Sequence, residues 1–445
     1  MISPNILFLH THNTGRHVQP YGYAVPTPNL QRLAEEGVLF RQAFSTAPTC
    51  SPSRASFLSG LYPHTCGMSG LAHRGFRMSD YRQHLVHGLS KHGYHTVLSG
   101  IEATTLNVSE IGYDQILSDL DVNYPHQTRP SDPAQAAADF LTNSPPEPFF
   151  LSVGLEETHR PFPQADSGAF VAEDPRYCRP PNALPDTSET RRDMANFKAS
   201  ARIMDQKIGT VLQVLEDANL VDDTLVFCFS DHGLQFPRHM ATLSDRGIGV
   251  FLVVRGPGGF QGGQVIDAMV SLIDMVPTVY DLAGIAPTDR LHGKSLRPLV
   301  NGEVSQLHEV IFAESSYHAA YEPMRCIRTE RYKYIKRFDD RDGPVLANVD
   351  RSPSKDVLLD HGWAGQPCPR EMLFDLVFDP NETCNLIEQP ELAAVGSDLR
   401  ARLAAWMAET GDPLLTQTIV PAPPGARIDD ADAAAPNTVL YRLEE

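Results

Sequence analysis

At residues 47–56 the chain reads Ala47-Pro48-Thr49-Cys50-Ser51-Pro52-Ser53-Arg54-Ala55-Ser56. The run follows an apolar segment at 38–44 and begins a predicted helix that ends near Gly60. Pro52 is tolerated in the first helical turn, where no N–H bond is needed. The positive end of the helix favours negative charge beside Cys50, and the Arg54 guanidinium can bind two oxygens of a sulfate or phosphate. This pattern indicates a nucleophile and anion site; the alternative is a buried cysteine without chemistry.

Three other apolar runs also end in polar side chains. The runs at 5–10, 148–155 and 224–230 lack alternation, which is typical of parallel strands buried on both faces. His12-Asn13, His159 and Asp231-His232 follow them, at the strand ends where open α/β sheets hold their ligands. Helices predicted at about 194–218 and at 271–283, and a further strand predicted at 249–254, alternate with these strands. The sequence therefore predicts an α/β fold with a doubly wound, mostly parallel sheet flanked by helices.

The sequence pattern changes after about residue 305. Short strand-like segments separated by turns, followed by a helix at about 391–409, predict a smaller antiparallel sheet. We therefore expect an α/β domain at 1–305 and an antiparallel subdomain with one helix at 306–415. Residues 416–445 form a tail rich in Pro, Ala and Asp, predicted to be an extended arm that is flexible or holds a partner.

The amino-acid composition restricts the classes of partner that the protein can bind. The 445 residues carry 37 Lys and Arg against 55 Asp and Glu, a net charge of -18, which argues against nucleic acid and against long polysulfated chains. A small anionic substrate in a locally positive pocket is compatible with this charge. No segment approaches 18 apolar residues, so we expect no contact with a membrane. Seven scattered cysteines and an N-terminus without signal-peptide features predict a cytoplasmic protein, and a homo-oligomer is left open.

The pattern Cys50-x-Pro52-x-Arg54 is also the signature of sulfatases. Over about residues 5–415 the chain resembles a sulfatase of the alkaline-phosphatase superfamily, since the first strand, Ser-Asp-His-Gly at 230–233, and the runs at 328–334 and 373–386 occur in the family's order. Among sulfatases it is most similar to sulfamidases, the N-sulfoglucosamine sulfohydrolases. The matching pieces lie at 149–160, 230–237 and 321–325.

This resemblance implies a sulfuric ester or sulfamate hydrolase acting on a small, sugar-like, sulfated substrate. It implies that a formylglycine-generating enzyme oxidises Cys50 to Cα-formylglycine. One hydroxyl of the hydrated aldehyde then attacks sulfur, and the other loses its proton and expels sulfate. Arg54 and His159 are the catalytic residues that the resemblance retains beside Cys50.

The resemblance also implies a divalent metal, bound by His12, Asn13, Asp231, His232 and residue 50. Most sulfatases have a carboxylate where His12 stands, usually another at Asn13, and calcium in the site. Calcium prefers oxygen ligands, so two imidazoles favour manganese or zinc, or weaker binding. The alternative is that His12 and Asn13 only cap a strand.

Other supporting residues of the family are missing. A Lys and a His are expected in the loop at 100–104, and a basic residue is expected at Met240. Arg238 or His239 can replace the latter if the loop shifts. His318 matches a substrate-pocket histidine of sulfamidases. His73 and Arg74 are further candidates for substrate binding, although surface loops commonly carry such residues.

Two alternative functions follow from these observations. A phosphate or phosphonate monoester hydrolase fits the same scaffold, because the tetrahedral anions are alike. A catalytically degenerate homologue that binds a sulfated ligand fits the missing Lys, His and basic residues.

Overall fold

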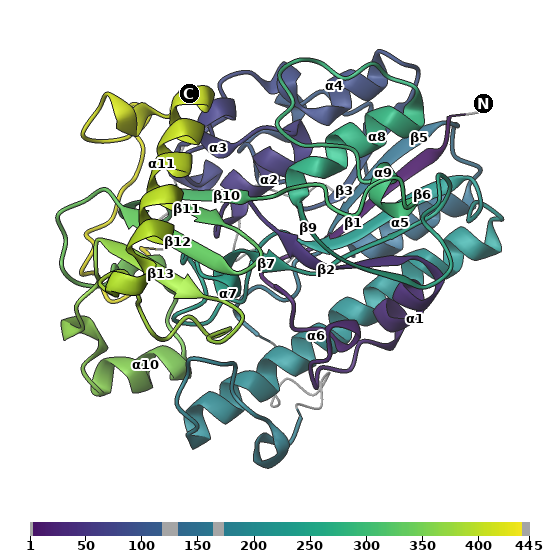
Figure 1. Ribbon diagram of the computed structural model, residues 1–445. Coiled ribbons are helices and arrows are strands. Elements are labelled where there is room, and N and C mark those ends of the chain that lie inside the picture. Colours follow the sequence, from purple (N-terminus) through teal and green to yellow (C-terminus); the bar gives the residue numbers. More distant parts are fainter. Residues whose placement is uncertain (1–2, 118–131, 163–172, 438–445) are drawn as a thin grey trace.

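The computed structural model describes residues 3–117, 132–162 and 173–437 (Figure 1). In this part of the chain a large sheet has the strand order β4-β3-β5-β1-β6-β8-β2-β7, with β9 paired to β2. A second sheet has the order β10-β11-β12-β13 and is antiparallel throughout. The predicted class, a mostly parallel doubly wound sheet with a smaller antiparallel sheet, is confirmed.

The strands of the large sheet are β1 (Asn5–Thr11), β2 (Val38–Phe44), β3 (His95–Gly100), β4 (Gln115–Ile116), β5 (Phe149–Gly154), β6 (Thr224–Ser230), β7 (Gly249–Val250), β8 (Leu252–Arg255) and β9 (Gln264–Ser271). Those of the small sheet are β10 (Ile311–Tyr317), β11 (Tyr321–Arg328), β12 (Tyr332–Arg337) and β13 (Glu371–Asp375). The α-helices are α1 (Pro28–Glu36), α2 (Cys50–Ser59), α3 (Pro63–Cys66), α4 (Leu85–Ser90), α5 (Pro133–Thr142), α6 (Ser188–Asp217), α7 (Asp245–Ile248), α8 (Met275–Ala283), α9 (Arg297–Val300), α10 (Pro353–Asp360) and α11 (Ala393–Thr410).

Strand β1 lies at the centre of the large sheet. It pairs in parallel with β5 on one side and β6 on the other, and every residue of all three strands is buried. Burial on both faces explains why these segments are apolar without alternation. Because the three strands are parallel neighbours, their carboxyl ends lie at one edge of the sheet.

Two predicted elements differ from the structure. The strand expected at 249–254 is divided into β7 and β8, because the Phe251 N–H between them donates to Gly15 O instead of to a neighbouring strand. The helix expected from Ser271 starts one residue later as a 3-10 turn at Leu272–Asp274 and continues as α8, because Ser271 is the last residue of β9, which pairs in parallel with β2.

Helices cover both faces of the large sheet. One apolar cluster packs α2, α4 and α8 on one face, and another packs α1, α5 and α6 on the other. The long helix predicted at 194–218 is α6, which starts earlier because Thr187 forms a capping box with Thr190. Figure 1 shows α6 running along the edge of the molecule beside α1.

The small sheet is joined to the main sheet by apolar packing and by buried charge. One of its faces packs on Phe44 and Met269, and α11 covers the other. Asp245, at the start of α7, forms ion pairs with Arg328 of β11 and Lys333 of β12. The predicted boundary at 305/306 falls in the segment between α9 and β10.

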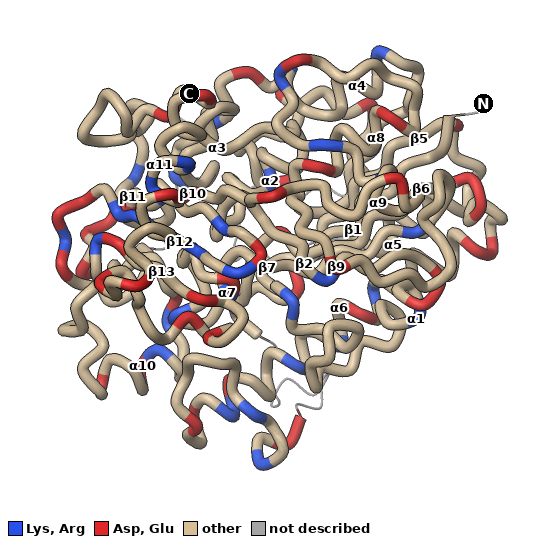
Figure 2. Tube along the Cα trace, viewed as in Figure 1, with Lys and Arg blue, Asp and Glu red and all other residues tan. Residues whose placement is uncertain are grey.

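The described part of the tail, residues 416–437, packs on its own chain. The Tyr317 hydroxyl donates to Val420 O, and the Leu346 N–H donates to Ala431 O. Residues 438–445 of the predicted arm, and residues 163–172, lie outside the described residues. Figure 2 shows Lys and Arg scattered among Asp and Glu along the trace. Of the described helices, none is long and apolar enough to cross a membrane.

Candidate active site

The Cys50 thiol lies at the first residue of α2, among side chains from the ends of two strands. Its Sγ is 2.9 Å from His12 Nε2, 3.3 Å from His232 Nε2 and 3.9 Å from Asn13 Oδ1. Asp231 belongs to the same group, since donor atoms of His12, Cys50, Asp231 and His232 all lie within 4.8 Å of one another. All five residues are buried. The structure therefore brings together the residues that the sequence predicted as a metal site; we call them the thiol cluster.

The Asp231 carboxylate is held by three hydrogen-bond donors and by an ion pair with the Arg54 guanidinium. Oδ1 accepts the backbone N–H groups of Asn13 at 2.9 Å and His232 at 2.8 Å. Oδ2 is 3.1 Å from Arg54 Nε and 3.0 Å from Arg54 Nη2. The Ser53 hydroxyl donates to Asp231 O at 2.6 Å, which ties α2 to the end of β6. Because Arg54 and Asp231 are both fully buried, each provides the countercharge that the other needs.

The turn after β6 requires a glycine. A Cβ at Gly233 would lie 2.0 Å from Arg246 O, and the Gly233 N–H donates to Gly247 O at 2.8 Å. His232 Nδ1 lies 3.1 Å from Gly233 O, so Nδ1 carries the proton and Nε2 presents a lone pair to Cys50. Burial lowers the pKa of His232, which favours this neutral form.

Arg54 is oriented by groups that line the sheet edge. Its Nη1 donates to His10 Nδ1 at 3.0 Å and to Ile101 O at 3.3 Å. His10 Nε2 in turn lies 3.2 Å from Ser152 Oγ. Burial, and then Arg54, lower the pKa of His10 well below its ordinary value, so the ring stays neutral and accepts from the guanidinium. Arg54 is thus fixed beside the thiol cluster.

The thiol cluster fits a divalent metal. Two imidazole nitrogens, one carboxylate and the atom at position 50 form a mixed set of donors of the kind that binds a divalent ion. Asn13 could contribute its side-chain oxygen, whereas its Nδ2, which is buried without a hydrogen-bond partner in the described residues, is a donor and requires an acceptor instead of a cation. Burial, and then Asp231, raise the pKa of the Cys50 thiol well above its usual value, so the unmodified sulfur is a neutral thiol and a poor nucleophile.

His159 lies directly against the thiol cluster. Its ring centroid is 4.5 Å from that of His12. Nδ1 is 2.5 Å from Arg160 O and donates to it, whereas Nε2 is 3.3 Å from the Gln235 side-chain nitrogen. Burial lowers the pKa of His159 to about 4. In this neutral state Nε2 accepts a hydrogen bond from the Gln235 amide, and the ring lies beside His12 after the carboxyl end of β5.

Asp350 places a second carboxylate near His159. Gln235 Nε2 donates to Asp350 Oδ2 at 2.5 Å, which links the loop after β6 to the C-terminal subdomain. Burial raises the pKa of Asp350, but His159 and His318 outweigh it and hold the pKa below its ordinary value. Lys355 Nζ donates to two carbonyls of the segment before Asp350 and fixes it in place.

His318 and His73 lie in the same electrostatic environment as Asp350. Burial lowers the pKa of His318, and Asp350 acts in the opposite direction. Burial, and then Arg74, lower the pKa of His73 to about 4. Arg74 is oriented toward the tail, since Nη2 lies 2.9 Å from Asp429 Oδ2. His73, His318 and Asp350 are therefore close enough to interact electrostatically, and Asp350 interacts with His159 in the same way; we call these three residues the outer wall.

The residues expected to replace missing basic groups lie elsewhere. Arg238 donates to Ala183 O and to the Gln366 side chain. His239 is buried with Nδ1 3.1 Å from Pro237 O and lines a different cavity. In the loop at 100–104, the Glu102 carboxylate accepts from Thr104 and pairs with His84. Among the described contacts, none joins Arg238 or His239 to the thiol cluster.

Sequence reasoning missed His10, Gln235 and Asp350. His10 had a signal, because it lies on β1 two residues before His12, which directly follows the strand. Gln235 lies only three residues after His232, in the turn that follows β6. Asp350 had no signal, since its place depends on how a second subdomain packs.

Comparisons with known proteins agree with this geometry. The sulfatase family model matches residues 4–285, and the model "N-sulphoglucosamine sulphohydrolase, C-terminal" matches residues 231–358. Human N-sulphoglucosamine sulphohydrolase is 32% identical, with 88% of this chain and 87% of that protein covered. An ulvan-active sulfatase of Formosa agariphila is 27% identical over 92% of this chain and 75% of that protein.

Solved structures have the same fold. A protein solved in complex with its substrate D-glucosamine-2-N,6-O-disulfate superposes with a TM-score of 0.72 at 16% identity, over 94% of this chain and 100% of the other. A phosphonate monoester hydrolase of Agrobacterium radiobacter superposes with a TM-score of 0.68 at 20% identity, over 92% and 96%. With the matching family models and the relative at 32% identity, these findings show that the chain belongs to the sulfatase family of hydrolases.

Proposed function

We propose that this sulfatase hydrolyses a sulfate ester or a sulfamate on a small, sugar-like substrate, with a formylglycine derived from Cys50 and a divalent metal. The observation that carries the proposal is the meeting of Cys50 with His12, Asp231 and His232 at the N-terminus of α2. A sugar substrate is supported by the similarity to human N-sulphoglucosamine sulphohydrolase.

The modified residue and the metal supply the parts that the unmodified side chains lack. A hydrated aldehyde at position 50 supplies two geminal hydroxyls, one to attack sulfur and one whose deprotonation releases sulfate. A metal held by His12, Asn13, Asp231 and His232 supplies positive charge toward the sulfate oxygens. We propose manganese or zinc, because the His12 imidazole stands where most sulfatases have a carboxylate and His232 adds a second imidazole.

The chain's own residues bind the substrate and transfer protons near position 50. Arg54 is held rigidly by Asp231 and His10 and places a fixed positive charge beside position 50. His159, neutral with an accepting Nε2, takes a proton from a hydroxyl of the reacting groups and returns it to the leaving group. Asp350, His73 and His318 form a polar wall that accepts and donates hydrogen bonds to substrate hydroxyls.

The maturation partner would be a formylglycine-generating enzyme, and the cell compartment the cytoplasm. The seven cysteines all lie in the described residues and each is a free thiol, which supports a reducing compartment.

Sulfate release tests the proposal. Protein produced together with a formylglycine-generating enzyme is incubated with glucosamine N-sulfate, an aryl sulfate, an aryl phosphate and a phosphonate monoester, and the released anion is quantified. We expect sulfate release to exceed phosphoryl hydrolysis, and Cys50→Ala to abolish it. Faster hydrolysis of the phosphoryl compounds would support the phosphate or phosphonate alternative. Binding of the sulfated sugar without turnover, in protein that carries the aldehyde and a metal, would support a degenerate homologue.

A further inference from the structure

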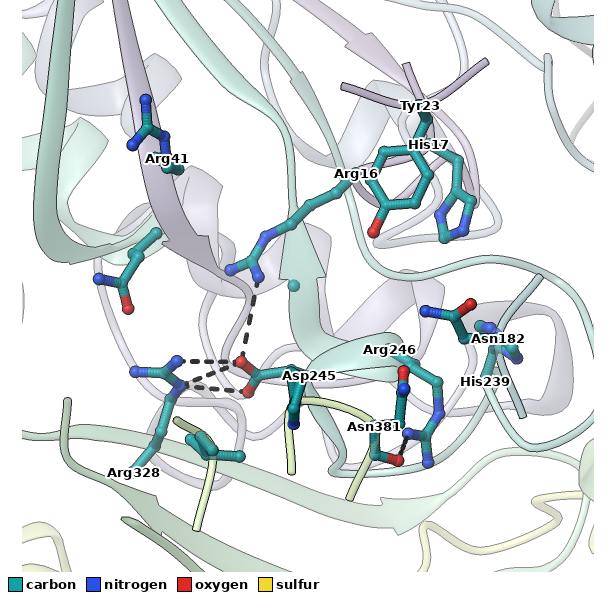
Figure 3. A pocket seen from close by; sticks show the side chains of 14 residues that line it. Arg16, His17, Tyr23, Arg41, Asn182, His239, Asp245, Arg246, Arg328 and Asn381 are labelled. Carbon is teal, nitrogen blue, oxygen red and sulfur yellow. Dashed lines mark hydrogen bonds and ion pairs between the residues drawn. The ribbon is translucent and has the colours of Figure 1, made fainter. Parts of the chain in front are cut away.

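A second polar cavity lies where the main sheet meets the C-terminal subdomain (Figure 3). Its volume is about 360 Å³. The main domain contributes Arg16, Arg41 and Arg246, and β11 contributes Arg328. Thiol-cluster residues are absent from its described lining, so the cavity is separate from the candidate active site.

The lining of this cavity is strongly positive in a chain of net charge -18. Four arginines line it against a single carboxylate, Asp245. That carboxylate is already shared, because it lies 3.0 Å from Arg328 Nη2, 4.0 Å from Arg16 Nη1, and against the buried Lys333 ammonium. Figure 3 shows the Arg16 and Arg328 side chains meeting at Asp245. Asp267 pairs with Arg41 and Glu382 with Lys333 behind the lining. Three carboxylates therefore face four arginines and one lysine, and positive charge remains for an anion.

Two buried polar atoms of the lining residues have no hydrogen-bond partner among the described residues. They are Arg16 Nε and His239 Nε2, and the His239 side chain is fully buried. Arg16 Nε is a donor. His239 Nδ1 donates to Pro237 O, so in the neutral ring Nε2 is an acceptor. A buried donor and a buried acceptor without partners are costly unless a ligand completes them.

These two atoms require opposite kinds of partner. A guanidinium binds the oxygens of a carboxylate, sulfate or phosphate, often in a bidentate manner. The lone pair of His239 Nε2 requires a hydroxyl or amide hydrogen. The exposed Asn182 and Tyr23 offer further groups to a hydroxylated molecule. The volume lies at the lower end of the range for small-molecule pockets.

We propose that this cavity binds a small hydroxylated anion of about monosaccharide size, such as a sugar acid, a sugar sulfate or a sugar phosphate. The anionic group lies against Arg16 and Arg246, and a hydroxyl donates to His239 Nε2. The site is independent of turnover at Cys50.

Isothermal titration of the full-length protein tests this assignment, with glucuronate, glucose 6-sulfate and glucose 6-phosphate as probes of the three anionic groups. Glucose, which has no anionic group, and inorganic sulfate, which has no sugar hydroxyls, are the control probes. We expect at least one sugar anion to bind about tenfold more tightly than either glucose or sulfate, and Arg246→Gln to weaken it about tenfold. Arg402→Gln, which removes the same charge on α11, should leave the affinity unchanged.

Crystals soaked in the tightest probe locate it, and we expect density between Arg246 and His239. Unchanged affinity in Arg246→Gln, density only at the thiol cluster, or sulfate binding as tightly as the sugar anions would overturn the proposal. Circular dichroism verifies that Arg246→Gln is folded. If it is not, the soaked crystals of the parent protein decide: density of the sugar anion between Arg246 and His239 supports the site, and its absence there overturns the proposal.

Discussion

The thiol cluster and the outer wall of the site are built in different ways. The thiol cluster comes from the ends of β1 and β6 and the start of α2, and every member is buried. The outer wall, His73, His318 and Asp350, comes from a loop and from the C-terminal subdomain. Strand ends in a parallel sheet are placed by hydrogen-bond register, whereas wall residues are placed by packing between subdomains. We therefore expect the cluster to govern chemistry and the wall to govern substrate affinity.

The largest effect is expected at Cys50. In Cys50→Ser the residue is not converted to the aldehyde, so we expect sulfate release to fall at least about 10⁴-fold. Steady-state assays of sulfate release measure it. Cys384→Ser, at an exposed cysteine, is the matched control and should keep full activity. A Cys50→Ser enzyme within tenfold of the parent would contradict a nucleophile at this position.

The second largest effect is expected on removal of the metal, which should affect the thiol cluster and not the outer wall. Chelation should lower kcat by at least about 100-fold, and manganese or zinc should restore it better than calcium, because two ligands are imidazoles. Elemental analysis of His12→Ala should show the metal content reduced. Full restoration by calcium alone would show that oxygen ligands dominate the site and would overturn the proposed metal.

The wall is tested by Asp350→Asn. Loss of one carboxylate that faces His159 and His318 should raise KM about tenfold and change kcat by less than about threefold. Asp340→Asn, whose side chain is 90% exposed, removes the same charge as a control. A lower kcat with unchanged KM would place Asp350 with the chemistry instead of with substrate affinity.

The smallest effect concerns stability against pH. Burial lowers the pKa of His318 below its ordinary 6.5, so the unfolded chain binds a proton more readily than the folded one. The free energy of unfolding should therefore fall as the pH drops below about 6.5, by at most about 1.4 kcal/mol per pH unit from this residue. Urea unfolding of His318→Gln should show a smaller fall between pH 7 and pH 5. His92→Gln, at an exposed histidine, should leave the slope unchanged, and an unchanged slope in His318→Gln would mean that the ring is not buried neutral.

The contrast between residues at strand ends and residues of the outer wall also explains which features could be predicted from the sequence. The fold class, the helix at Cys50 and the ends of β1, β5 and β6 follow from apolar runs without alternation, because burial on both faces leaves that pattern. Asp350 leaves no local pattern, since its contact with Gln235 spans 115 residues. Arg238 and His239 were predicted as substitutes because they lie one or two positions from Met240, whereas the turn of that segment directs them to Gln366 and to the second cavity.

The central claim is that Cys50 becomes the aldehyde nucleophile of a sulfatase. Mass spectrometry of the peptide that contains Cys50, from protein produced with a formylglycine-generating enzyme, tests it most directly when sulfate release is measured on the same sample. We predict an aldehyde in place of the thiol, with sulfate release in proportion to the converted fraction. An unmodified thiol in protein that hydrolyses sulfated substrates at full rate would contradict the claim.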